Sequence, residues 1–205
     1  VTLDKVEADD IIAYLSDVTP QKKEDKVFIV SSDKDFLQLI NENVIVYRPM
    51  EKEYYTVDTV IEKFKMSPNN FILYKTLMGD NSDKVAGIKG LGEKKLYKLF
   101  PELTTQEMTL EDIYNISVKR LKENVIYARV IQNFASLETN YKIMDLSKPM
   151  IDKNDENYLD GVVKSKDIHY LPDQFVSMYN TDQLGGIIRN VEHWVKDCFE
   201  SLQIK

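Results

Sequence analysis

The pattern of hydrophobic and polar positions divides the chain into a short α/β part and a longer helical part. Apolar residues at helical spacing predict a helix over residues 7–16, and four consecutive apolar residues at 27–30 predict a strand buried on both faces. A short helix at 35–40, a strand at 44–47 and an edge segment at 53–57 follow. Strand, helix and strand in alternation are typical of an α/β layer.

Helical periodicity dominates from residue 57 onward. Apolar positions three and four residues apart predict helices over residues 57–65, 69–78, 93–100, 110–116, 119–137 and 184–202. Residues 140–172 show no clear period and are expected to be irregular. The sequence therefore predicts two domains: residues 1–56, with α/β structure, and residues 57–205, which are helical.

Composition narrows the chemistry. One cysteine and two histidines among 205 residues exclude an internal disulfide and argue against a Cys/His zinc site, so a metal ion would bind oxygen ligands. No apolar run approaches the roughly 18 residues of a membrane span, and the first residues do not have the charged-then-apolar pattern expected of a signal peptide. We therefore expect a cytoplasmic protein without a membrane partner, in the host cytoplasm if a phage encodes it. The net charge of −7 allows nucleic-acid binding only if the charges are segregated.

Three acidic clusters lie at junctions between predicted elements. They are Glu7, Asp9 and Asp10; Asp33 and Asp35; and Asp80 and Asp83. Each cluster alone has an ordinary explanation, as a helix N-terminus, a cap or a polar turn. Together they point to cations, because crowded carboxylates repel one another and hard divalent ions such as Mg²⁺ or Mn²⁺ prefer oxygen ligands. Two such ions about 3.5–4 Å apart can drive phosphodiester hydrolysis.

A glycine-rich segment begins at the third cluster and continues beyond it. It contains Gly79, Gly87, Gly90 and Gly92, four of the seven glycines in the chain. Between residues 84 and 98, five lysines outnumber the single Glu93, which makes a basic patch in an acidic protein: Lys84, Lys89, Lys94, Lys95 and Lys98. Close backbone approach and a basic patch favour phosphate binding. A tight helix–helix turn with solvated lysines is the alternative.

In their order and spacing these motifs resemble the 5′-nuclease family, which includes flap endonucleases, the 5′–3′ exonuclease domain of bacterial DNA polymerase I and phage ribonuclease H. The likeness is greatest to the T-even phage ribonuclease H. The motifs are Glu-Ala-Asp-Asp at 7–10, Ser-Asp-Lys-Asp-Phe at 32–36, Tyr-Arg-Pro at 47–49, Gly-Asp-Asn-Ser-Asp at 79–83 and Gly-Ile-Lys-Gly-Leu-Gly-Glu-Lys at 87–94. They cover about residues 4–100.

The resemblance implies a fold and a set of site residues. The fold is a mostly parallel PIN-like α/β sheet followed by a helix–three-turn–helix DNA-binding region at 79–100. Asp9 and Asp33 would hold the catalytic metal with Glu7 and Asp10 nearby, and a second Mg²⁺ or Mn²⁺ would bind Asp35, Asp80 and Asp83. The residues expected to carry catalysis are Asp9, Asp33, Asp35 and Asp83. Those expected to contact DNA are Lys84, Gly87, Lys89, Gly90, Gly92, Lys94 and Lys95, and the carbonyls of Ile88 and Leu91 would hold a K⁺ ion.

The implied function is metal-dependent 5′-nuclease activity in DNA replication, on 5′ flaps, nicks and RNA–DNA hybrids. Single-strand-binding protein or a sliding clamp would be partners. Lys84 and Ala86 depart from the family pattern, and the family carries two further aspartates and a basic arch upstream of the first motif. We therefore expect this chain to be a poor nuclease alone and to need a separate N-terminal piece. The alternatives are a non-catalytic structure-specific DNA-binding module and a small PIN-type ribonuclease.

Overall fold

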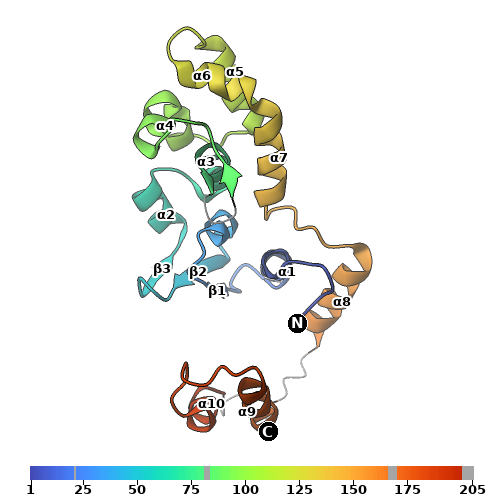
Figure 1. The fold of residues 1–205 in the computed structure, drawn as a ribbon. Coiled ribbons are helices and arrows are strands. Elements are labelled where there is room, and N and C mark those ends of the chain that lie inside the picture. The colour runs from blue at the N-terminus through green and yellow to red at the C-terminus, as the bar shows by residue number, and fades with distance from the viewer. Residues whose placement is uncertain (21, 81–83, 166–169, 200–205) are drawn as a thin grey trace. The chain divides into compact units, whose positions relative to one another are not determined.

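Figure 1 shows the computed structural model of the chain, which describes residues 1–20, 22–80, 84–165 and 170–199. The chain forms two compact units, Val1–Asp160 and Gly161–Lys205, and each is described separately. In the described ranges, no helix has both the length and the apolar character needed to span a membrane.

The first unit begins with a mixed α/β layer, as expected from the sequence. Three strands form a sheet in the order β1-β2-β3: Val27–Val30, Val44–Arg48 and Glu53–Tyr55. β1 and β2 are parallel with Val27 opposite Val44, whereas β2 and β3 are antiparallel with Val46 opposite Tyr55. Two helical elements join this layer, the α-helix α1 (Ala8–Val18) and the 3₁₀-helix η1 (Asp35–Leu39). Parallel pairing places the carboxyl ends of β1 and β2 at one edge of the sheet.

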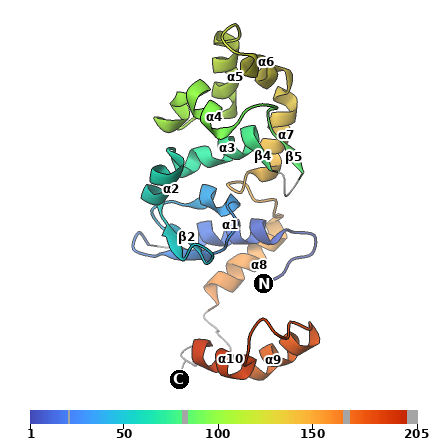
Figure 2. The same cartoon turned by 60° about the vertical axis from the view of Figure 1, so that its left-hand side comes forward.

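After β3 the first unit is helical apart from one short two-stranded sheet. Its remaining elements are α2 (Val57–Phe64), η2 (Pro68–Asn70), α3 (Phe71–Met78), β4 (Gly79–Asp80), β5 (Val85–Ala86), α4 (Glu93–Leu99), η3 (Pro101–Thr104), α5 (Leu110–Lys119), α6 (Val125–Gln132), α7 (Phe134–Met144) and α8 (Lys153–Lys164), whose last four residues belong to the second unit. α7 packs beside α3, as Figures 1 and 2 both show.

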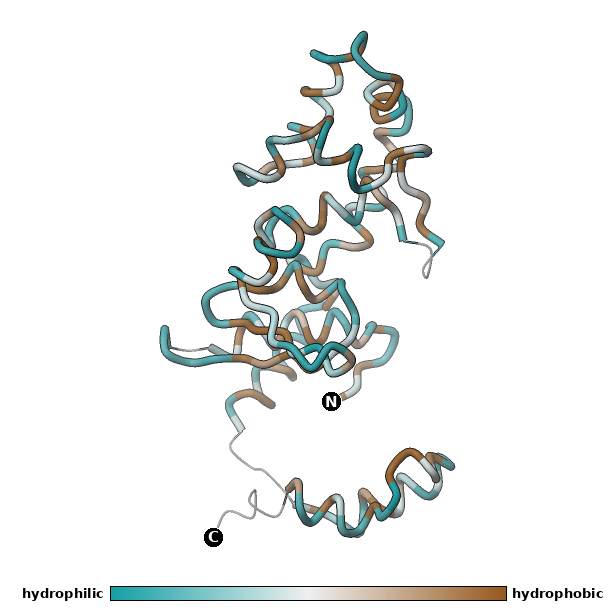
Figure 3. Tube along the Cα trace, turned by 90° about the vertical axis from the view of Figure 1, so that its left-hand side faces the viewer, coloured by the Kyte–Doolittle hydropathy of each residue, from teal (hydrophilic) through white to brown (hydrophobic). Residues whose placement is uncertain are grey.

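Two hydrophobic cores lie in this unit, and α3 contributes to both. Phe71 belongs to the core beneath the three-stranded sheet, together with Ile29, Leu37 and Val46. Leu73 and Leu77 belong to the second core with α4 to α7, whose buried members include Leu96, Phe100, Ile113, Tyr127 and Leu137. Along the helices in Figure 3, brown hydrophobic stretches alternate with teal polar ones. This alternation is typical of amphipathic helices that turn one face inward.

The expectation that strand 27–30 is buried on both faces was wrong. Ile29 is buried, but Phe28 is 54% exposed and Val30 is 67% exposed. β1 pairs only with β2 in the described structure, and the side chains that alternate away from the core lie on an open sheet face beside Tyr54. A continuous apolar run therefore does not establish two-sided burial.

Two predictions about helical segments also need correction. The helix predicted over 119–137 is interrupted, because the Asn124 side chain accepts a hydrogen bond from the Ile126 backbone and begins α6, which ends at Gln132. The segment 140–172, expected to be irregular, contains the end of α7, α8 and the start of α9. Asp152 begins α8 by accepting hydrogen bonds from the backbone N–H groups of Asn154 and Asp155. These side-chain caps override the apolar periodicity.

The second unit is a small pair of helices. α9 (Pro172–Thr181) and α10 (Val191–Phe199) pack through a core formed by Tyr179, Val191 and Val195. The Tyr179 hydroxyl accepts a hydrogen bond of 2.8 Å from the backbone of Ile188, which fixes the connecting turn. The helix predicted over 184–202 begins only at Val191, and residues 200–202 of that prediction lie outside the described residues.

Candidate active site and nucleic-acid interface

The first acidic cluster forms the start of α1. Glu7 is the residue before the helix, and its side chain makes no capping hydrogen bond. Asp9 is partly buried, whereas Asp10 is buried and its Oδ1 accepts a 3.0 Å hydrogen bond from the backbone of Met150. Asp10 therefore anchors the segment that follows α7, and its assignment as a metal residue stays a prediction.

The second cluster follows β1 at the carboxyl edge of the sheet. The Asp33 backbone donates to the Ser31 hydroxyl at 3.0 Å, and the Asp35 backbone donates to Asp33 Oδ1 at 2.8 Å. These bonds form the turn into η1, so Asp33 has an ordinary role as a turn residue, but the N-cap of η1 is Lys34 and not Asp33. The same turn presents Asp35, which begins η1, toward α3.

A lysine joins the second cluster to the third. Lys75, on α3, is buried, and its ammonium group forms ion pairs with both Asp35 and Asp80. Asp80 belongs to β4, two residues after α3 ends. Asp83 of the same predicted cluster lies outside the described residues. Lys75 was not singled out from the sequence, although it is the one charged residue in the apolar run Phe71–Met78, six of whose eight residues are buried.

Electrostatic coupling shows that the three clusters converge. The pKa of Asp9 is raised by partial burial and then by the charges of Asp33, Asp35, Glu7 and Asp10. The pKa of Asp35 is raised by burial and by Asp33 and Asp80, although Lys75 opposes that rise. Asp9 on α1 and Asp80 on β4 are therefore each coupled to Asp35, which follows the turn after β1.

The convergent side chains fit a hard cation in donor chemistry and in charge. Asp9, Asp33, Asp35 and Asp80 present only oxygen donors, and with the one ammonium of Lys75 they leave three formal negative charges. Across the part of the chain that the structure describes, however, no three acidic, histidine or cysteine side chains are gathered closely enough to hold an ion. Two of the four carboxylates are instead turned to Lys75.

The glycine-rich segment forms a compact hairpin between α3 and α4. Ile88 and Leu91 are buried in the helical core, and the Ile88 backbone donates to the Leu77 carbonyl at 2.8 Å. Gly90 has a φ of +81°, a conformation that side-chain-bearing residues rarely adopt. The hairpin is thus fixed to the core by its apolar residues and turned by its glycine.

Arg129 of α6 clamps this hairpin from outside. Its Nη1 donates a 2.5 Å hydrogen bond to the Lys89 carbonyl, and a Cβ on Gly90 would lie 2.9 Å from the same atom. Lys95 adds a second tie, because its Nζ donates to the Gly90 carbonyl at 2.9 Å. The clamp links residues 40 positions apart, so no local sequence signal could have identified it.

The predicted DNA-contacting lysines are exposed around the hairpin. Lys84, Lys89, Lys94 and Lys95 are all exposed, and a shallow hollow is lined by residues 90–95. Lys84 has a φ of +58°, a left-handed conformation. Gly92 precedes α4 with an extended backbone, and a Cβ there would meet nothing within 4 Å. Exposed ammonium groups around a rigid turn can neutralise phosphates without reading sequence.

Arg48, the arginine of the Tyr-Arg-Pro motif, is not part of the exposed basic surface. It ends β2, is buried, and donates from Nη2 to Glu51 Oε1 at 2.8 Å. Its guanidinium lies 5.4 Å from the centre of the Tyr55 ring. Nε and Nη1 are buried and have no hydrogen-bond partner in the described structure. The arginine of the Tyr-Arg-Pro motif thus packs inward and is held by stacking and one ion pair.

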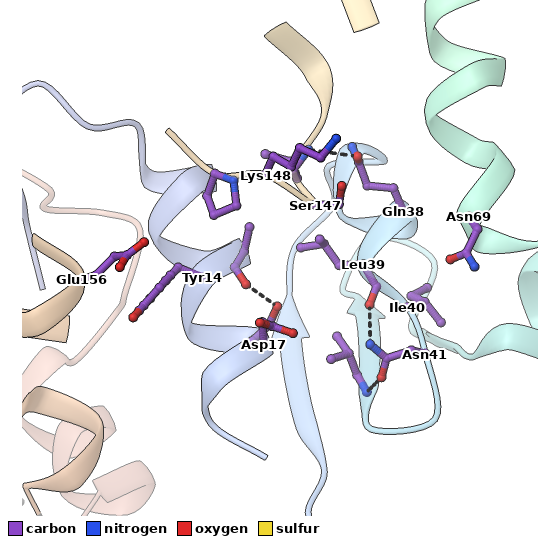
Figure 4. Close-up of a pocket in the computed structure, with 15 residues that line it drawn as sticks. Tyr14, Asp17, Gln38, Leu39, Ile40, Asn41, Asn69, Ser147, Lys148 and Glu156 are labelled. Carbon is purple, nitrogen blue, oxygen red and sulfur yellow. Dashed lines mark hydrogen bonds between the residues drawn. The ribbon is translucent and has the colours of Figure 1, made fainter. Parts of the chain in front are cut away.

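A pocket of about 460 Å³ lies elsewhere in the first unit, between α1 and the segments around residues 38–41 and 146–149 (Figure 4). Tyr14 lies on its wall, and its hydroxyl donates to Asp160 at 2.8 Å. Burial and then Asp160 raise the pKa of Tyr14 to about 12. None of the predicted metal or DNA residues lines this pocket, so it does not belong to the candidate site.

Comparison with known proteins agrees with these features. Residues 1–65 match the family model described as "5'-3' exonuclease, N-terminal resolvase-like domain". A 5′-3′ exonuclease of Aquifex aeolicus is 43% identical over 106 residues, which cover 52% of this chain and 36% of that protein. DNA polymerase I of Bacillus subtilis is 38% identical over 127 residues, covering 60% of this chain and 14% of that protein. The chain therefore corresponds to about a third or less of the length of these relatives.

The fold also matches solved structures. A complex of the bacteriophage T5 flap endonuclease with DNA and metal ions superimposes with a TM-score of 0.66 at 21% identity. The match covers 80% of this chain and 60% of the phage protein. At this identity the likeness concerns the fold, and it confirms the mixed α/β architecture with a helical region.

Proposed function

Because this chain is a relative of the 5′-nuclease family in sequence motifs and fold, we propose that it is part of a metal-dependent 5′-nuclease that hydrolyses phosphodiesters during DNA replication. One observation carries the proposal: Asp9, Asp33 and Asp80, which come from the three acidic motifs, all interact electrostatically with Asp35. Asp80 also lies directly before the hairpin that bears the exposed lysines. Carboxylates beside a phosphate-binding surface are what a metal-assisted nuclease requires.

We assign different tasks to the two parts of the sequence. Residues 1–56, joined by Asp80 and Asp83, would supply the ligands of two Mg²⁺ or Mn²⁺ ions, with Asp9 and Asp33 at the first ion and Asp35 at the second. When bound, the ions would polarise the scissile phosphate and lower the pKa of the attacking water. Residues 57–205 would hold duplex DNA through the helix–three-turn–helix region at 79–100.

The proposal that the hairpin holds DNA rests on how firmly the turn is fixed to the protein. The buried Ile88 and Leu91 and the Arg129 clamp hold the turn, so Lys89 and Lys94 can meet phosphates at a fixed distance from the carboxylates. A K⁺ ion at 87–92 is part of the same proposal, with the carbonyls of Ile88 and Leu91 as ligands. The Gly90 carbonyl is already engaged by Lys95.

The proposed substrates are 5′ flaps, nicks and the RNA–DNA hybrids of primers. These structures have in common a duplex that the hairpin could hold and a 5′ strand that ends near the carboxylates. Single-strand-binding protein and a sliding clamp as partners, and a cytoplasmic location, follow from the resemblance and stay predictions.

The test is cleavage of a labelled 5′ flap by the purified chain in Mg²⁺ or Mn²⁺, alone and with the upstream nuclease segment of a relative supplied as a separate chain. We expect duplex binding in both samples, but cleavage only where the upstream segment is supplied, and Asp33→Asn should abolish that cleavage. Asp17→Asn, a change outside the three clusters, is the matched control and should cleave like the parent. Binding without any cleavage in both samples would favour the non-catalytic DNA-binding module instead.

A further inference from the structure

The environment of Lys75 is unusual for a lysine. The residue is only 8% exposed, and its side chain ends between Asp35 and Asp80, whose side chains are themselves about 15% exposed. Burying an ammonium group costs free energy unless opposite charges compensate it. Burial alone would lower the pKa of Lys75, but Asp35 and Asp80 raise it overall. The ammonium is therefore held by this pair of carboxylates.

The pair that Lys75 holds comes from two different motifs. Asp35 begins η1 after β1, and Asp80 lies on β4 after α3. Two carboxylates that approach each other in a partly dry site repel, and a positive charge between them removes that repulsion. A divalent cation could remove it equally well, and it carries twice the charge of an ammonium group. Lys75 and a metal ion are thus alternative counter-ions for the same two side chains.

We propose that Lys75 is a built-in counter-cation, which holds Asp35 and Asp80 together in the absence of metal and releases them when a divalent ion binds. The inference rests on the proposed metal-dependent function and names a positioning residue for it. Metal binding at this pair is then a competition, in which each ion must displace the ammonium group. Lys75 keeps the two carboxylates together without metal. The affinity for the metal ion is weaker in consequence, because the ion must displace the ammonium group.

The geometry of the surrounding helix supports an exchange of this kind. Lys75 lies on α3 between Leu73 and Leu77, which are both fixed in the helical core. The backbone that carries Lys75 therefore cannot move far, while its four-carbon side chain can turn without disturbing the helix. Only the ammonium group needs to leave the pair.

The experiment measures Mn²⁺ binding without DNA, at one fixed pH, from the loss of the free-ion paramagnetic resonance signal. Lys75→Met removes the charge and keeps an apolar stem of similar length. We expect Mn²⁺ to bind this variant about tenfold more tightly or better than the parent protein, since no ammonium has to be displaced. The melting temperature of the variant should be lower in a chelator and should rise more than that of the parent on adding Mn²⁺.

Lys63→Met is the matched control, because Lys63 pairs at 2.5 Å with Glu53 on the surface and not with a predicted ligand. Its Mn²⁺ affinity should equal that of the parent. Adding Asp35→Asn to Lys75→Met should remove the gain. Equal or weaker Mn²⁺ binding by Lys75→Met would overturn the proposal.

A second variant keeps the proposal testable if Lys75→Met does not fold. In Lys75→Arg the planar guanidinium can hold both carboxylates through paired hydrogen bonds, so Mn²⁺ should bind more weakly than to the parent. Equal or tighter binding by Lys75→Arg would refute the competition. Mn²⁺ binding that no variant changes would leave the nuclease proposal standing and reject only the role of Lys75. No Mn²⁺ binding by any of the proteins would reject both.

Discussion

Gly79 and Gly87 lie backbone against backbone at the base of the glycine-rich hairpin. A Cβ on Gly79 would lie 2.3 Å from the Gly87 nitrogen, and a Cβ on Gly87 would lie 2.4 Å from the Gly79 nitrogen. The two residues connect β4, which carries Asp80, with the turn that carries the lysines. The distance between the acidic side chains and the proposed phosphate-binding surface is therefore fixed by a close approach that only glycine allows.

Gly87→Ala should disrupt this close approach. The new methyl would lie 2.2 Å from the carbonyl carbon of Met78, which is rigid backbone, so we expect a loss of about 1–3 kcal/mol or more in the free energy of unfolding. Chemical denaturation measures the loss. Gly92→Ala is the control, since its methyl would meet nothing within 4 Å. Similar stability of the two variants would contradict the packing described for Gly87.

Lys94→Ala and Lys95→Ala should each weaken duplex binding similarly for all sequences. The reason is that an ammonium group beside a phosphate reads no base, and removing one such ion pair should reduce the slope of log K against log salt by about 0.9. Lys95→Ala also removes the bond to the Gly90 carbonyl and should have the larger effect. Fluorescence anisotropy at several salt concentrations provides the measurement. An unchanged slope in both variants would mean that the phosphates lie elsewhere.

Asp9→Asn should stabilise the metal-free protein while it abolishes cleavage. Asp9 lies within range of the charges of Asp33 and Asp35, and removing one negative charge relieves that repulsion. We expect the melting temperature in a chelator to rise on the order of a degree or two, because the carboxylate is only partly buried. Asp4→Asn, outside the clusters, should leave the melting temperature unchanged. A fall in melting temperature would show that Asp9 makes a stabilising interaction instead.

The start of α5 provides a test by pH. The Thr109 side chain accepts from the Asp112 backbone, and the Asp112 carboxylate accepts from the backbone and the hydroxyl of Thr109, which holds the pKa of Asp112 below its ordinary value. The stabilisation is therefore complete above that ordinary value and is lost as the pH falls through the lower folded pKa. Thr109→Ala should cost about 1 kcal/mol at neutral pH.

Acid unfolding of the parent and of Asp112→Asn checks the sign. The difference in stability between the two proteins should be constant near neutral pH and should shrink only in the acidic range below the ordinary aspartate pKa. A difference that grows as the pH falls would be the opposite result and would exclude the capping box as its source.

The elements of the fold that have strong local signals could be predicted from the sequence. Apolar spacing predicts α1, β2 and α2. The alternation of strand, helix and strand predicts the α/β layer in which β1 and β2 pair in parallel. Periodicity did not predict the break at Asn124 or the start of α8 at Asp152, although both residues are ordinary helix caps and carry a local signal of their own. The exposure of Phe28 could not be predicted, because it depends on what covers the sheet.

The candidate site also contains some residues that local sequence signals identify and some contacts that they do not. Dense acidic motifs such as Asp33 and Asp35 are local signals, and so is the glycine-rich hairpin. Lys75 and Arg129 act over 40 positions, to Asp35 and to the Lys89 carbonyl. Lys75 stands out as the one charged residue in the apolar run 71–78, but no local pattern identifies the partner of either side chain. Interactions of this kind arise from tertiary packing, which residue pattern alone does not specify.

The sharing of α3 between two hydrophobic cores has a consequence for how the first unit unfolds. Phe71 and Leu73 are two residues apart, so the helix cannot melt in one core and stay ordered in the other. Amide hydrogens on α3 should exchange only through global opening, at the same slow limit as those of β2 and α6. The carboxylate-bearing layer and the hairpin layer would then form a single cooperative unit, in which destabilising either one raises the unfolded population of both.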